Sequence, residues 1–427
     1  MKVPGIIVIG AGASGMTAAI EAAKRGFKVT IIEANDKPGK KIYATGNGKC
    51  NLTNKKMDVS CFRGSDIKFI ASVLERFGYK DTINYFSELG LMFKDRNGYI
   101  YPASGQASSV VKSLVLECEK NDIKILCKVT ALNVLKSADI FTVETDNGNY
   151  KADGVILSTG SKAGILPGKL PKVNGYDITK KLGHKIIPLQ PALTGIKCKN
   201  NVFYREVQGV RCDGKIMVYS DNRFAGSDMG ELQLTSYGIS GIPAFQVSRY
   251  AAYSLYNKKN TYIQVDFMPD ISSQELISKI TYKIHGNPNI KISEYLNGIL
   301  NNKLAEAIVN YAGINKNITG RDIKEGRDKK RIVGCLVQAI KEYKDKVTGV
   351  NEFKDAQVLA GGVSLKEIKE NMESAYVKNL YITGEVLDAD GICGGYNLQW
   401  AWATGYIAGN SILKSGEKYD KDKSDKD

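Results

Sequence analysis

The sequence predicts an α/β protein built on a parallel β-sheet, and three adjoining segments carry this prediction. Residues 5–10 form a short apolar run of β-branched residues, which is typical of a buried parallel strand. A G-x-G-x-x-G sequence follows directly, and apolar side chains then recur at helical spacing until about residue 25. Residues 27–33 form a second apolar strand that ends on a glutamate. In this order, the segments form the start of a Rossmann-like unit.

The residue types of this unit point to a bound dinucleotide. Gly10 permits the tight turn out of the strand, Gly12 lets a pyrophosphate approach the backbone, and Gly15 lets the helix pack closely on the strand. The amide groups and the positive end of the helix then face the phosphates. Glu33 lies 18 residues after Gly15, where a carboxylate accepts hydrogen bonds from ribose hydroxyls. The same carboxylate would repel the 2′-phosphate of NADP, which argues against NADP in this site.

Length and composition limit the class of protein. The 427 residues leave room for two or three domains, and no apolar run approaches the length of a transmembrane helix. The N-terminus lacks the charged segment and cleavage site of a signal peptide, so we expect a cytoplasmic protein. Its eight cysteines are scattered without a C-x-x-C, and the only histidines are His184 and His285. We therefore expect no metal site, reduced thiols and structural histidines.

The net charge of +15 comes from 60 basic and 45 acidic residues. Such an excess occurs in proteins that bind nucleic acid or anionic surfaces. We interpret it instead as lysines spread over a solvated surface and a tail. The tail, residues 414–427, is rich in Lys and Asp and poor in apolar residues, so we expect it to be disordered. This interpretation predicts no nucleic-acid partner and no membrane contact.

The rest of the first half combines a polar loop with regular elements. Residues 44–54 hold glycines among amides and hydroxyls, and their backbone N–H groups are suited to line a polar ligand. The expected elements are two helices within residues 64–90, a hairpin at 92–102, a helix at 107–121, a β-meander from 123 to 150, and a buried strand at 152–158 that ends at Thr159 and Gly160.

The middle of the chain changes character. Short strands are expected at 193–198, 202–210, 215–219, 231–241 and 262–267, as in a small barrel. Residues 272–338 are helical and lysine-rich, and a strand returns at 353–358. The predicted domains are a nucleotide-binding domain of residues 1–187 and 352–413, an inserted β-barrel of residues 188–270 and 335–351, a helical subdomain of residues 271–334, and the disordered tail. A separation this long between two strands of one sheet requires an inserted domain, which we expect to select the substrate.

The C-terminal segment repeats the pattern of strand, glycine turn and helix. A strand at 380–383 leads into Gly384 and Glu385, and a second glycine turn precedes a helix expected over 396–412. A helix N-terminus aimed at a ligand suits a flavin, whose N1–C2=O region gains negative charge on reduction. The first and last segments of the chain must then meet in one domain.

These motifs together identify a family. The chain resembles the flavoprotein family described as HI0933-like, whose members include bile-acid 3-dehydro-Δ4,6-reductases and aminoacetone oxidases. The matching blocks are IIVIGAGASGMTAA, KPGKKIYATGNGKCNLTN, YPASGQASSVV, GELQLTSYGISG, AGGVSLKEI and GEVLDADGICGGYNLQWAWATGYIAG. They span almost the full length, and TGNGKCN and GGYNLQWAW are far more specific than G-x-G-x-x-G.

The resemblance implies an FAD-binding domain of the two-dinucleotide-binding flavoprotein type, built from both chain ends, with an inserted β-barrel and helical subdomain. It implies a pyrophosphate site at the first glycines, the adenosine ribose at Glu33 and adenine at Val129. Many relatives have Thr where this chain has Cys393, which is either a small filler or a thiol near the flavin. The full set of implied FAD contacts is Gly10, Gly12, Ala13, Ser14, Gly15, Glu33, Ala34, Lys41, Thr45, Gly46, Asn47, Gly48, Lys49, Cys50, Asn51, Val129, Thr159, Gly160, Gly384, Glu385, Asp388, Gly394, Gly395, Tyr396, Asn397 and Leu398.

The expected function is that of an FAD-dependent oxidoreductase. We favour reduction of an activated C=C bond in a small or steroid-like substrate, with NADH or NADPH as a transient electron donor. No second complete G-x-G-x-x-G exists for the nicotinamide dinucleotide, so that donor would dock only transiently. Two alternatives stay open, a flavin amine oxidase that uses O₂ and a flavin-containing nucleic-acid-binding protein. The sequence identifies neither a catalytic acid or base nor an oligomeric state.

Overall fold

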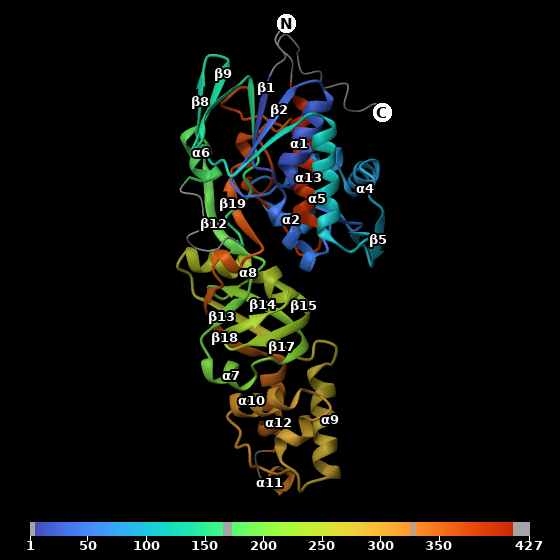
Figure 1. The fold of residues 1–427 in the computed structure, drawn as a ribbon. Coiled ribbons are helices and arrows are strands. Elements are labelled where there is room, and N and C mark those ends of the chain that lie inside the picture. Colours follow the sequence, from blue (N-terminus) through green and yellow to red (C-terminus); the bar gives the residue numbers. More distant parts are fainter. Residues whose placement is uncertain (1–4, 165–172, 326–328, 413–427) are drawn as a thin grey trace. The chain divides into compact units, whose positions relative to one another are not determined.

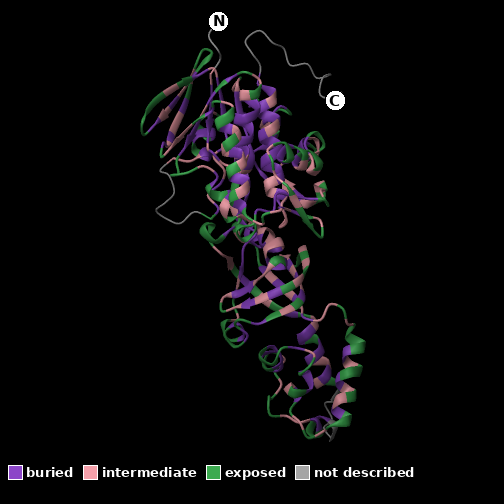
Figure 2. Cartoon of the chain, turned by 45° about the vertical axis from the view of Figure 1, so that its right-hand side comes forward, coloured by how far each residue is buried: buried purple, intermediate pink, exposed green. Residues whose placement is uncertain are grey.

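A computed structural model describes residues 5–164, 173–325 and 329–412, and the predicted tail lies outside them. The chain divides into two compact units (Figure 1). The first unit contains the chain up to Leu189 and from Val358 onward, and the second contains residues 190–357. Each unit has its own hydrophobic core, with the buried residues gathered inside its sheets and helices (Figure 2). None of the described helices is long and apolar enough to cross a membrane.

A five-stranded sheet forms the centre of the first unit. Its order is β20 (Leu380–Ile382), β11 (Gly154–Leu157), β1 (Gly5–Ile9), β2 (Lys28–Glu33) and β7 (Lys124–Cys127), and every pairing is parallel. The predicted parallel sheet is therefore confirmed. The meander expected from residue 123 is wrong at its start, because β7 pairs with β2. The helix before β7 returns the chain across the sheet, so β7 meets β2 in parallel rather than as a hairpin.

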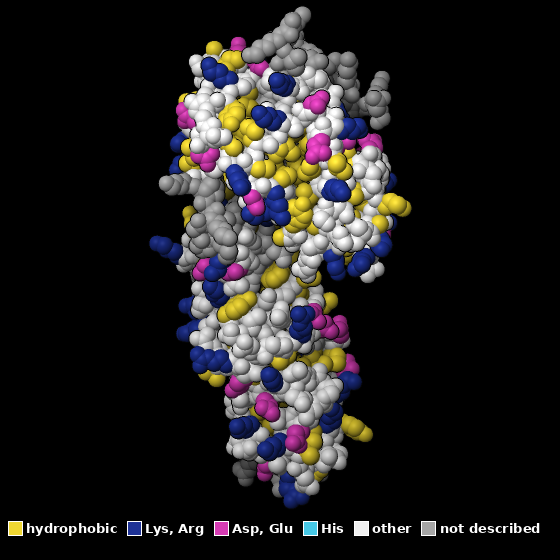
Figure 3. Space-filling model, in the orientation of Figure 1, with side chains coloured by type: hydrophobic (Ala, Val, Ile, Leu, Met, Phe, Trp, Pro, Cys, Tyr) yellow, Lys and Arg dark blue, Asp and Glu magenta, His cyan; other side chains and the backbone are white. Residues whose placement is uncertain are grey.

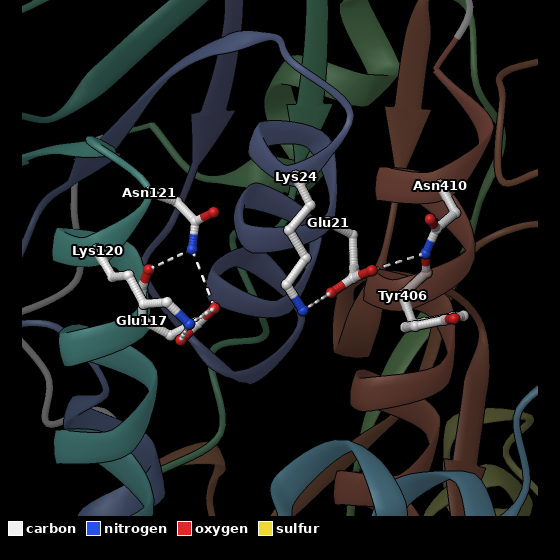
Figure 4. Close-up of polar contacts among 7 residues, drawn as sticks. All are labelled: Glu21, Lys24, Glu117, Lys120, Asn121, Tyr406 and Asn410. Carbon is white, nitrogen blue, oxygen red and sulfur yellow. Dashed lines mark hydrogen bonds and ion pairs between the residues drawn. The ribbon is translucent and has the colours of Figure 1, made fainter. Parts of the chain in front are cut away.

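Two helices from opposite ends of the chain pack against each other in this unit. Contacts between α1 (Ala13–Lys24) and α13 (Tyr396–Ser411) depend on glycine, because a Cβ on Gly405 would lie 2.4 Å from the Ser14 carbonyl oxygen. Buried Glu21 accepts hydrogen bonds from Lys24 Nζ and Asn410 Nδ2, both at 3.1 Å (Figure 4). This polar contact fixes the register of α1 against α13.

The remaining elements of the first unit surround the sheet. The helices expected within residues 64–90 and at 107–121, and the hairpin at 92–102, are confirmed. Their bounds and those of the neighbouring elements are α2 (Lys40–Ala44), η1 (Thr45–Gly48), β3 (Thr53–Asn54), η2 (Val59–Cys61), β4 (Phe62–Gly64), α3 (Ile67–Arg76), α4 (Tyr79–Glu88), β5 (Phe93–Arg96), β6 (Tyr99–Pro102), α5 (Ala107–Lys120), β8 (Ala131–Ser137), β9 (Ile140–Thr145), β10 (Gly148–Ala152), α6 (Gly175–Lys181), η5 (Leu365–Glu367), η6 (Gly384–Val386) and β21 (Ala389–Gly391). In addition, β12 (Ile186–Ala192) pairs with β19 (Val358–Val363); the chain passes to the second unit within β12 and returns to the first where β19 begins.

The second unit contains a closed barrel followed by helices, as the predicted fold class requires. The barrel order is β13 (Ile196–Cys198), β16 (Gly238–Ser240), β15 (Arg223–Thr235), β14 (Arg211–Ser220), β17 (Thr261–Asp266) and β18 (Tyr343–Val350). Its alternate residues point inward and are buried, as Ile216, Val218, Ile263 and Val265 are. The helical part consists of α9 (Ser273–Gly286), η3 (Ile292–Leu296), α10 (Asn302–Tyr311), α11 (Gly320–Glu325) and α12 (Lys329–Lys341).

Two expectations for the middle of the chain are wrong, and one helix was not predicted. Residues 202–210 were expected as a strand but begin within helix α7 (Asn201–Glu206), because the Asn200 side chain caps the Phe203 N–H and starts a helix. The strand expected at 353–358 begins as the 3-10 turn η4 (Phe353–Asp355), and β19 starts only at its apolar run. Helix α8 (Ile242–Tyr256) had no counterpart among the expected elements, and its Pro243 lies in the first helical turn, where proline is tolerated.

Candidate functional site

The first candidate contact surface lies where β1 meets α1. Gly10 has φ of +104°, and a Cβ there would lie 2.4 Å from the Ser158 carbonyl oxygen. Gly15 is equally restricted, since its Cβ would lie 1.9 Å from the Gly10 carbonyl oxygen. A Cβ on Gly12, by contrast, would meet nothing within 4 Å, and no side chain caps the helix there. Two glycines therefore serve packing, and the third leaves open space before the N-terminus of α1, as a phosphate requires.

Glu33 is buried at the end of β2 and already holds several donors. One carboxylate oxygen accepts the Ala11 N–H at 2.7 Å, and the other accepts Asn35 N at 2.8 Å and Asn35 Nδ2 at 2.6 Å. A carboxylate accepts about four hydrogen bonds, so capacity remains for about one more from a ligand. Buried Val129 donates its N–H to the Glu33 carbonyl oxygen at 3.0 Å, which places it beside the same strand end. Ala34 is exposed there.

A second group of predicted residues meets at the ends of β11 and β20. Lys41 Nζ donates to Glu385 Oε2 at 2.6 Å and to Ser161 Oγ at 3.4 Å. Glu385 Oε1 and Thr159 Oγ1 are buried, and neither atom has a hydrogen-bond partner in the described part of the chain. These orphaned oxygens, with the lysine beside them, fit a polar ligand that supplies the missing contacts.

Two glycines at this edge of the sheet differ, because Gly384 permits a close contact whereas Gly160 leaves open space. Gly384 has φ of +77°, and a Cβ there would lie 2.4 Å from Ser14 Oγ, so this turn touches the start of α1. Its N–H is held by Thr404 Oγ1 at 3.0 Å. A Cβ on Gly160 would meet nothing within 4 Å. Asp388, further along, is buried and donates its N–H to the Val363 carbonyl oxygen at 2.9 Å.

The polar loop around η1 has an unusual backbone. Gly46, Asn47, Gly48 and Cys50 all have positive φ, between +53° and +80°, and left-handed non-glycine residues cluster at functional sites. Thr45 Oγ1 donates to the Ile42 carbonyl oxygen at 2.7 Å and fixes the start of the loop. The Cys50 thiol is buried, which raises its pKa to about 12. This thiol is therefore neutral and fills space.

The loop ends against the glycine turn that precedes α13. Asn51 Oδ1 is buried without a partner among the described residues, and a Cβ on Gly395 would lie 3.0 Å from it. Asn397 closes the turn, since its side chain accepts the Gly391 N–H at 2.8 Å and donates to the Gly391 carbonyl oxygen at 2.9 Å. Tyr396 OH donates to the Lys56 carbonyl oxygen at 3.0 Å. The neighbouring residues Gly394 and Leu398 are partly exposed on this turn.

The structure thus brings most predicted contacts to one edge of the sheet and one adjoining loop. Lys49 differs from the other predicted contacts, because its side chain is exposed and lines a separate pocket together with Tyr101. Sequence reasoning missed Asn35 and Ser161, which hold Glu33 and Lys41 in place. Asn35 follows Glu33 by two residues, and that proximity could have indicated its role. No local pattern points to Ser161.

His184 is buried in a closed network with Glu367 and Ser374. Its Nδ1 lies 3.2 Å from Glu367 Oε2, and its Nε2 lies 2.9 Å from Ser374 Oγ. The Ser374 hydroxyl also accepts the N–H groups of Tyr376 and Val377, so its own proton goes to His184. Burial lowers the pKa of His184. Although the order resembles a Ser–His–Glu triad, the serine is only 1% exposed, so we interpret the network as structural.

A dinucleotide fits these residues on three grounds. Gly12 and Gly160 leave space for a ligand at the backbone. Three buried oxygens, on Asn51, Thr159 and Glu385, lack partners within the described residues. Two helix N-termini without side-chain caps, those of α1 and α13, begin at this site. In the described ranges, no three His, Cys, Asp or Glu side chains gather as a metal site would require.

Comparisons with known proteins find relatives that match nearly the full length of this chain. A 3-dehydro-bile acid delta(4,6)-reductase from Clostridium scindens is 41% identical over 95% of this chain and 98% of its own length. Ribosomal RNA dihydrouridine synthases are also similar, at 28% identity for the Haemophilus influenzae protein, covering 96% of this chain and 98% of that one. The Escherichia coli synthase is 26% identical and covers 95% and 97%.

The family model described as the HI0933-like protein Rossmann domain matches residues 4–411. The predicted family, the Rossmann-type FAD-binding fold and the assignment to oxidoreductases are therefore confirmed. The chain belongs to the HI0933-like family.

Proposed function

We propose that this protein is an FAD-dependent reductase of a C=C bond conjugated to a carbonyl group in a small or steroid-like substrate. The observation that carries the proposal is the 41% identity, over nearly the full length of both chains, to a protein named as a reductase of a 3-dehydro bile acid. In such a bond, hydride adds to the carbon remote from the carbonyl and a proton adds to the nearer carbon. The supporting geometry is the set of glycine turns, helix N-termini and orphaned oxygens described above.

The residues that would hold FAD fall into two groups. The pyrophosphate would lie at Gly12 and the α1 N-terminus, with the adenosine ribose at Glu33. The isoalloxazine would lie beside Asn51 and the turn at 394–398, which contact each other. When bound, FAD supplies the two-electron carrier. The positive end of α13 would favour the negative charge that a flavin gains on reduction, and the unpartnered Asn51 Oδ1 could only accept a hydrogen bond from the group.

NADH or NADPH would serve as a transient electron donor. The test is anaerobic mixing of the FAD-loaded protein with NADH or with NADPH, followed by addition of a 3-oxo-4-ene steroid. Bleaching of the flavin by the donor and its reoxidation by the steroid are expected. Aminoacetone is the comparison substrate, and rapid bleaching by this amine without bleaching by either nicotinamide would refute the reductase and favour the amine oxidase.

A second candidate is reduction of uracil in RNA. The uracil ring also carries a C=C bond conjugated to a carbonyl, so the same chemistry applies to both substrates. Two chain-length relatives are named ribosomal RNA dihydrouridine synthases. If this candidate holds, the prediction of no nucleic-acid partner fails and the charge of +15 has a function.

An aromatic row on the outer barrel face favours this candidate. Phe224, Tyr219, Tyr262 and Lys346 lie side by side on β15, β14, β17 and β18, as the strand register requires. The Tyr219 and Tyr262 rings are stacked, parallel within 5° with their centroids 4.9 Å apart, and Tyr262 pairs with Lys346 of β18 on its other side. Phe224 is 60% exposed. Lys346 is exposed, and stacking rings beside a basic side chain are typical of surfaces that bind single-stranded nucleic acid.

A binding experiment separates the two candidates. A uridine-rich single-stranded RNA should bind with affinity that falls steeply with salt, and Tyr262→Ala should weaken it by about 1–3 kcal/mol. Tyr282→Ala is the matched control, because Tyr282 is 81% exposed on α9, away from the row. Equal affinity of both variants would remove this support and leave the small-molecule reductase alone.

We also propose a cytoplasmic location. All eight cysteines are free thiols, which suits a reducing compartment. A fractionation experiment that found the protein outside the cytoplasm would contradict this assignment.

A further inference from the structure

The β5–β6 hairpin, the segment after it and Lys49 line a pocket that has three basic side chains. Its walls are Lys49, Lys94, Arg96, Tyr101 and the turn at residues 102–105. Basic side chains gather at the edge of the first unit in Figure 3, over the place where Figure 1 labels β5. Only Lys49 belongs to the FAD contacts that the family resemblance implies, so the FAD site does not account for this pocket.

The alternation of the hairpin places Lys94, Arg96 and Tyr101 on one face. Lys94 and Arg96 are two residues apart on β5, and Tyr101 is directly opposite Lys94 on β6. The Arg96 guanidinium carbon lies 5.7 Å from the centroid of the Tyr101 ring. Asp95, between the two cations in sequence, points to the other face. The hairpin therefore separates its positive side chains from its acidic one.

No carboxylate neutralises this pocket. Within the described residues, Lys49, Lys94 and Arg96 form no ion pair. Asp95 is held by Lys55 Nζ at 2.7 Å and by the Gly98 N–H at 2.7 Å. Three like charges around one cavity repel one another, and an anion bound between them removes that repulsion.

The pocket adjoins the proposed isoalloxazine site. Lys49 lies within the loop of left-handed residues, between Gly48 and Cys50, and a Cβ on Gly46 would lie 3.5 Å from Tyr101 Cε1. Tyr99, on the same strand as Tyr101, lies against the second glycine turn, since a Cβ on Gly394 would be 2.8 Å from Tyr99 Cε1. An anion held by the hairpin would therefore keep the rest of its ligand near the residues proposed to hold the flavin ring.

We propose that Lys49, Lys94, Arg96 and Tyr101 form a binding site for one oxyanion, a phosphate or a carboxylate, on the ligand that reacts at the flavin. Arg96 supplies a planar fork that matches either group, the lysines supply point charges, and the Tyr101 hydroxyl donates a hydrogen bond. The ligand is either the nicotinamide dinucleotide donor or the substrate itself. This assignment to a reacting ligand rests on the proposed function, whereas the anion site rests on the pocket.

The first experiment measures binding of inorganic pyrophosphate to the FAD-loaded protein by isothermal titration calorimetry. Saturable binding is expected, and Lys94→Gln and Arg96→Gln should each weaken it about tenfold. Lys68→Gln is the matched control, because Lys68 is exposed on α3 outside the pocket and loses the same charge. Absence of saturable binding, or an equal loss in Lys68→Gln, would overturn the anion site.

The second experiment identifies which ligand carries the anion. In Arg96→Gln, a loss of flavin reduction rate with NADPH but not with NADH assigns the site to the donor's 2′-phosphate, and an equal loss with both assigns it to the pyrophosphate. A rise in KM for a 3-oxo steroid carboxylate but not for a neutral 3-oxo steroid assigns it to the substrate. Unchanged kinetics in every arm would overturn the assignment to a reacting ligand.

The two hypotheses fail separately. Tight pyrophosphate binding without reduction of any C=C bond would defeat the proposed function and leave the anion site. Normal turnover without pyrophosphate binding would defeat the anion site and leave the proposed function.

Discussion

The contact between α1 and α13 makes Gly405→Ala the most informative substitution in the molecule. A Cβ at this position would lie 2.4 Å from the Ser14 carbonyl oxygen and 3.0 Å from Ser14 Cα, both backbone atoms. Carbon atoms of this kind essentially never approach within 3.0 Å, and neither backbone atom can rotate away. The two helices must therefore separate by several tenths of an ångström at their closest point.

The free-energy cost of Gly405→Ala follows from the loss of packing between the two helices. Overpacking of a close contact costs about 1–3 kcal/mol, and a gap of 0.5–1 Å removes roughly a quarter to a half of the dispersion energy of the atoms beside it. Because Ser14 belongs to the first turn of α1, the same shift moves the proposed phosphate site. If FAD binding must restore the original position of this turn, each 1.4 kcal/mol needed to do so weakens FAD affinity about tenfold.

The assay is thermal unfolding followed by FAD release, with Gly334→Ala as the control. Gly334 lies within α12, and a Cβ there would meet nothing within 4 Å. Gly334→Ala is expected to raise the free energy of unfolding by about 0.5–1 kcal/mol, whereas Gly405→Ala should lower it. If Gly405→Ala is as stable as the wild type and retains FAD as tightly, the packing argument is wrong.

Further predictions address the cofactor, the inserted unit and pH. The purified protein should be yellow, with FAD released by denaturation, and a colourless protein that FAD cannot reconstitute would contradict the central proposal. Glu33→Ala should weaken FAD binding by about 1–3 kcal/mol in a fluorescence titration, because it removes a charged acceptor; unchanged affinity would displace the ribose from β2. Substitutions in residues 231–241 should change turnover and leave FAD content intact, and the reverse pattern would make the insertion part of the cofactor scaffold. Burial lowers the folded-state pKa of His184 below 6.5, so the unfolded chain binds more protons and stability should fall as pH drops through about 6.5. His184→Gln should flatten that pH dependence in denaturant titrations, and an unchanged profile would assign it to other groups.

The sequence predicted the elements whose determinants are local. The βαβ unit was recognisable because its strand, glycines and helix adjoin one another, and α13 because its helical pattern follows a glycine turn. The strand expected at 202–210 was wrong because short apolar runs suit either period, and one capping side chain, that of Asn200, decided for helix α7. The pairing of β7 with β2 was not predicted, because it depends on the preceding helix returning the chain across the sheet.

The candidate site was predictable only as a set of segments. Motifs indicated Lys41 and Glu385 separately, but their ion pair joins residues 344 positions apart and depends on the completed sheet. The orphaned oxygens of Asn51 and Thr159 emerge only when burial is known. The unpaired cations of the β5–β6 hairpin likewise required the strand register, which separates them from Asp95.

The pairing of α1 with α13 also constrains how the protein matures as it is synthesised. The ribosome delivers α1 first, but the helix that completes its packing and the second glycine turn emerge only after residue 396. The inserted unit, residues 190–357, is contiguous and has its own core, so it can fold while the first unit still waits for its last strand and helix. FAD binding is then a late event. Until α13 packs against α1, the apolar face of α1 is accessible to chaperones and proteases. A stop codon before α13 should therefore yield a folded insertion attached to an unfinished, degradable nucleotide-binding unit.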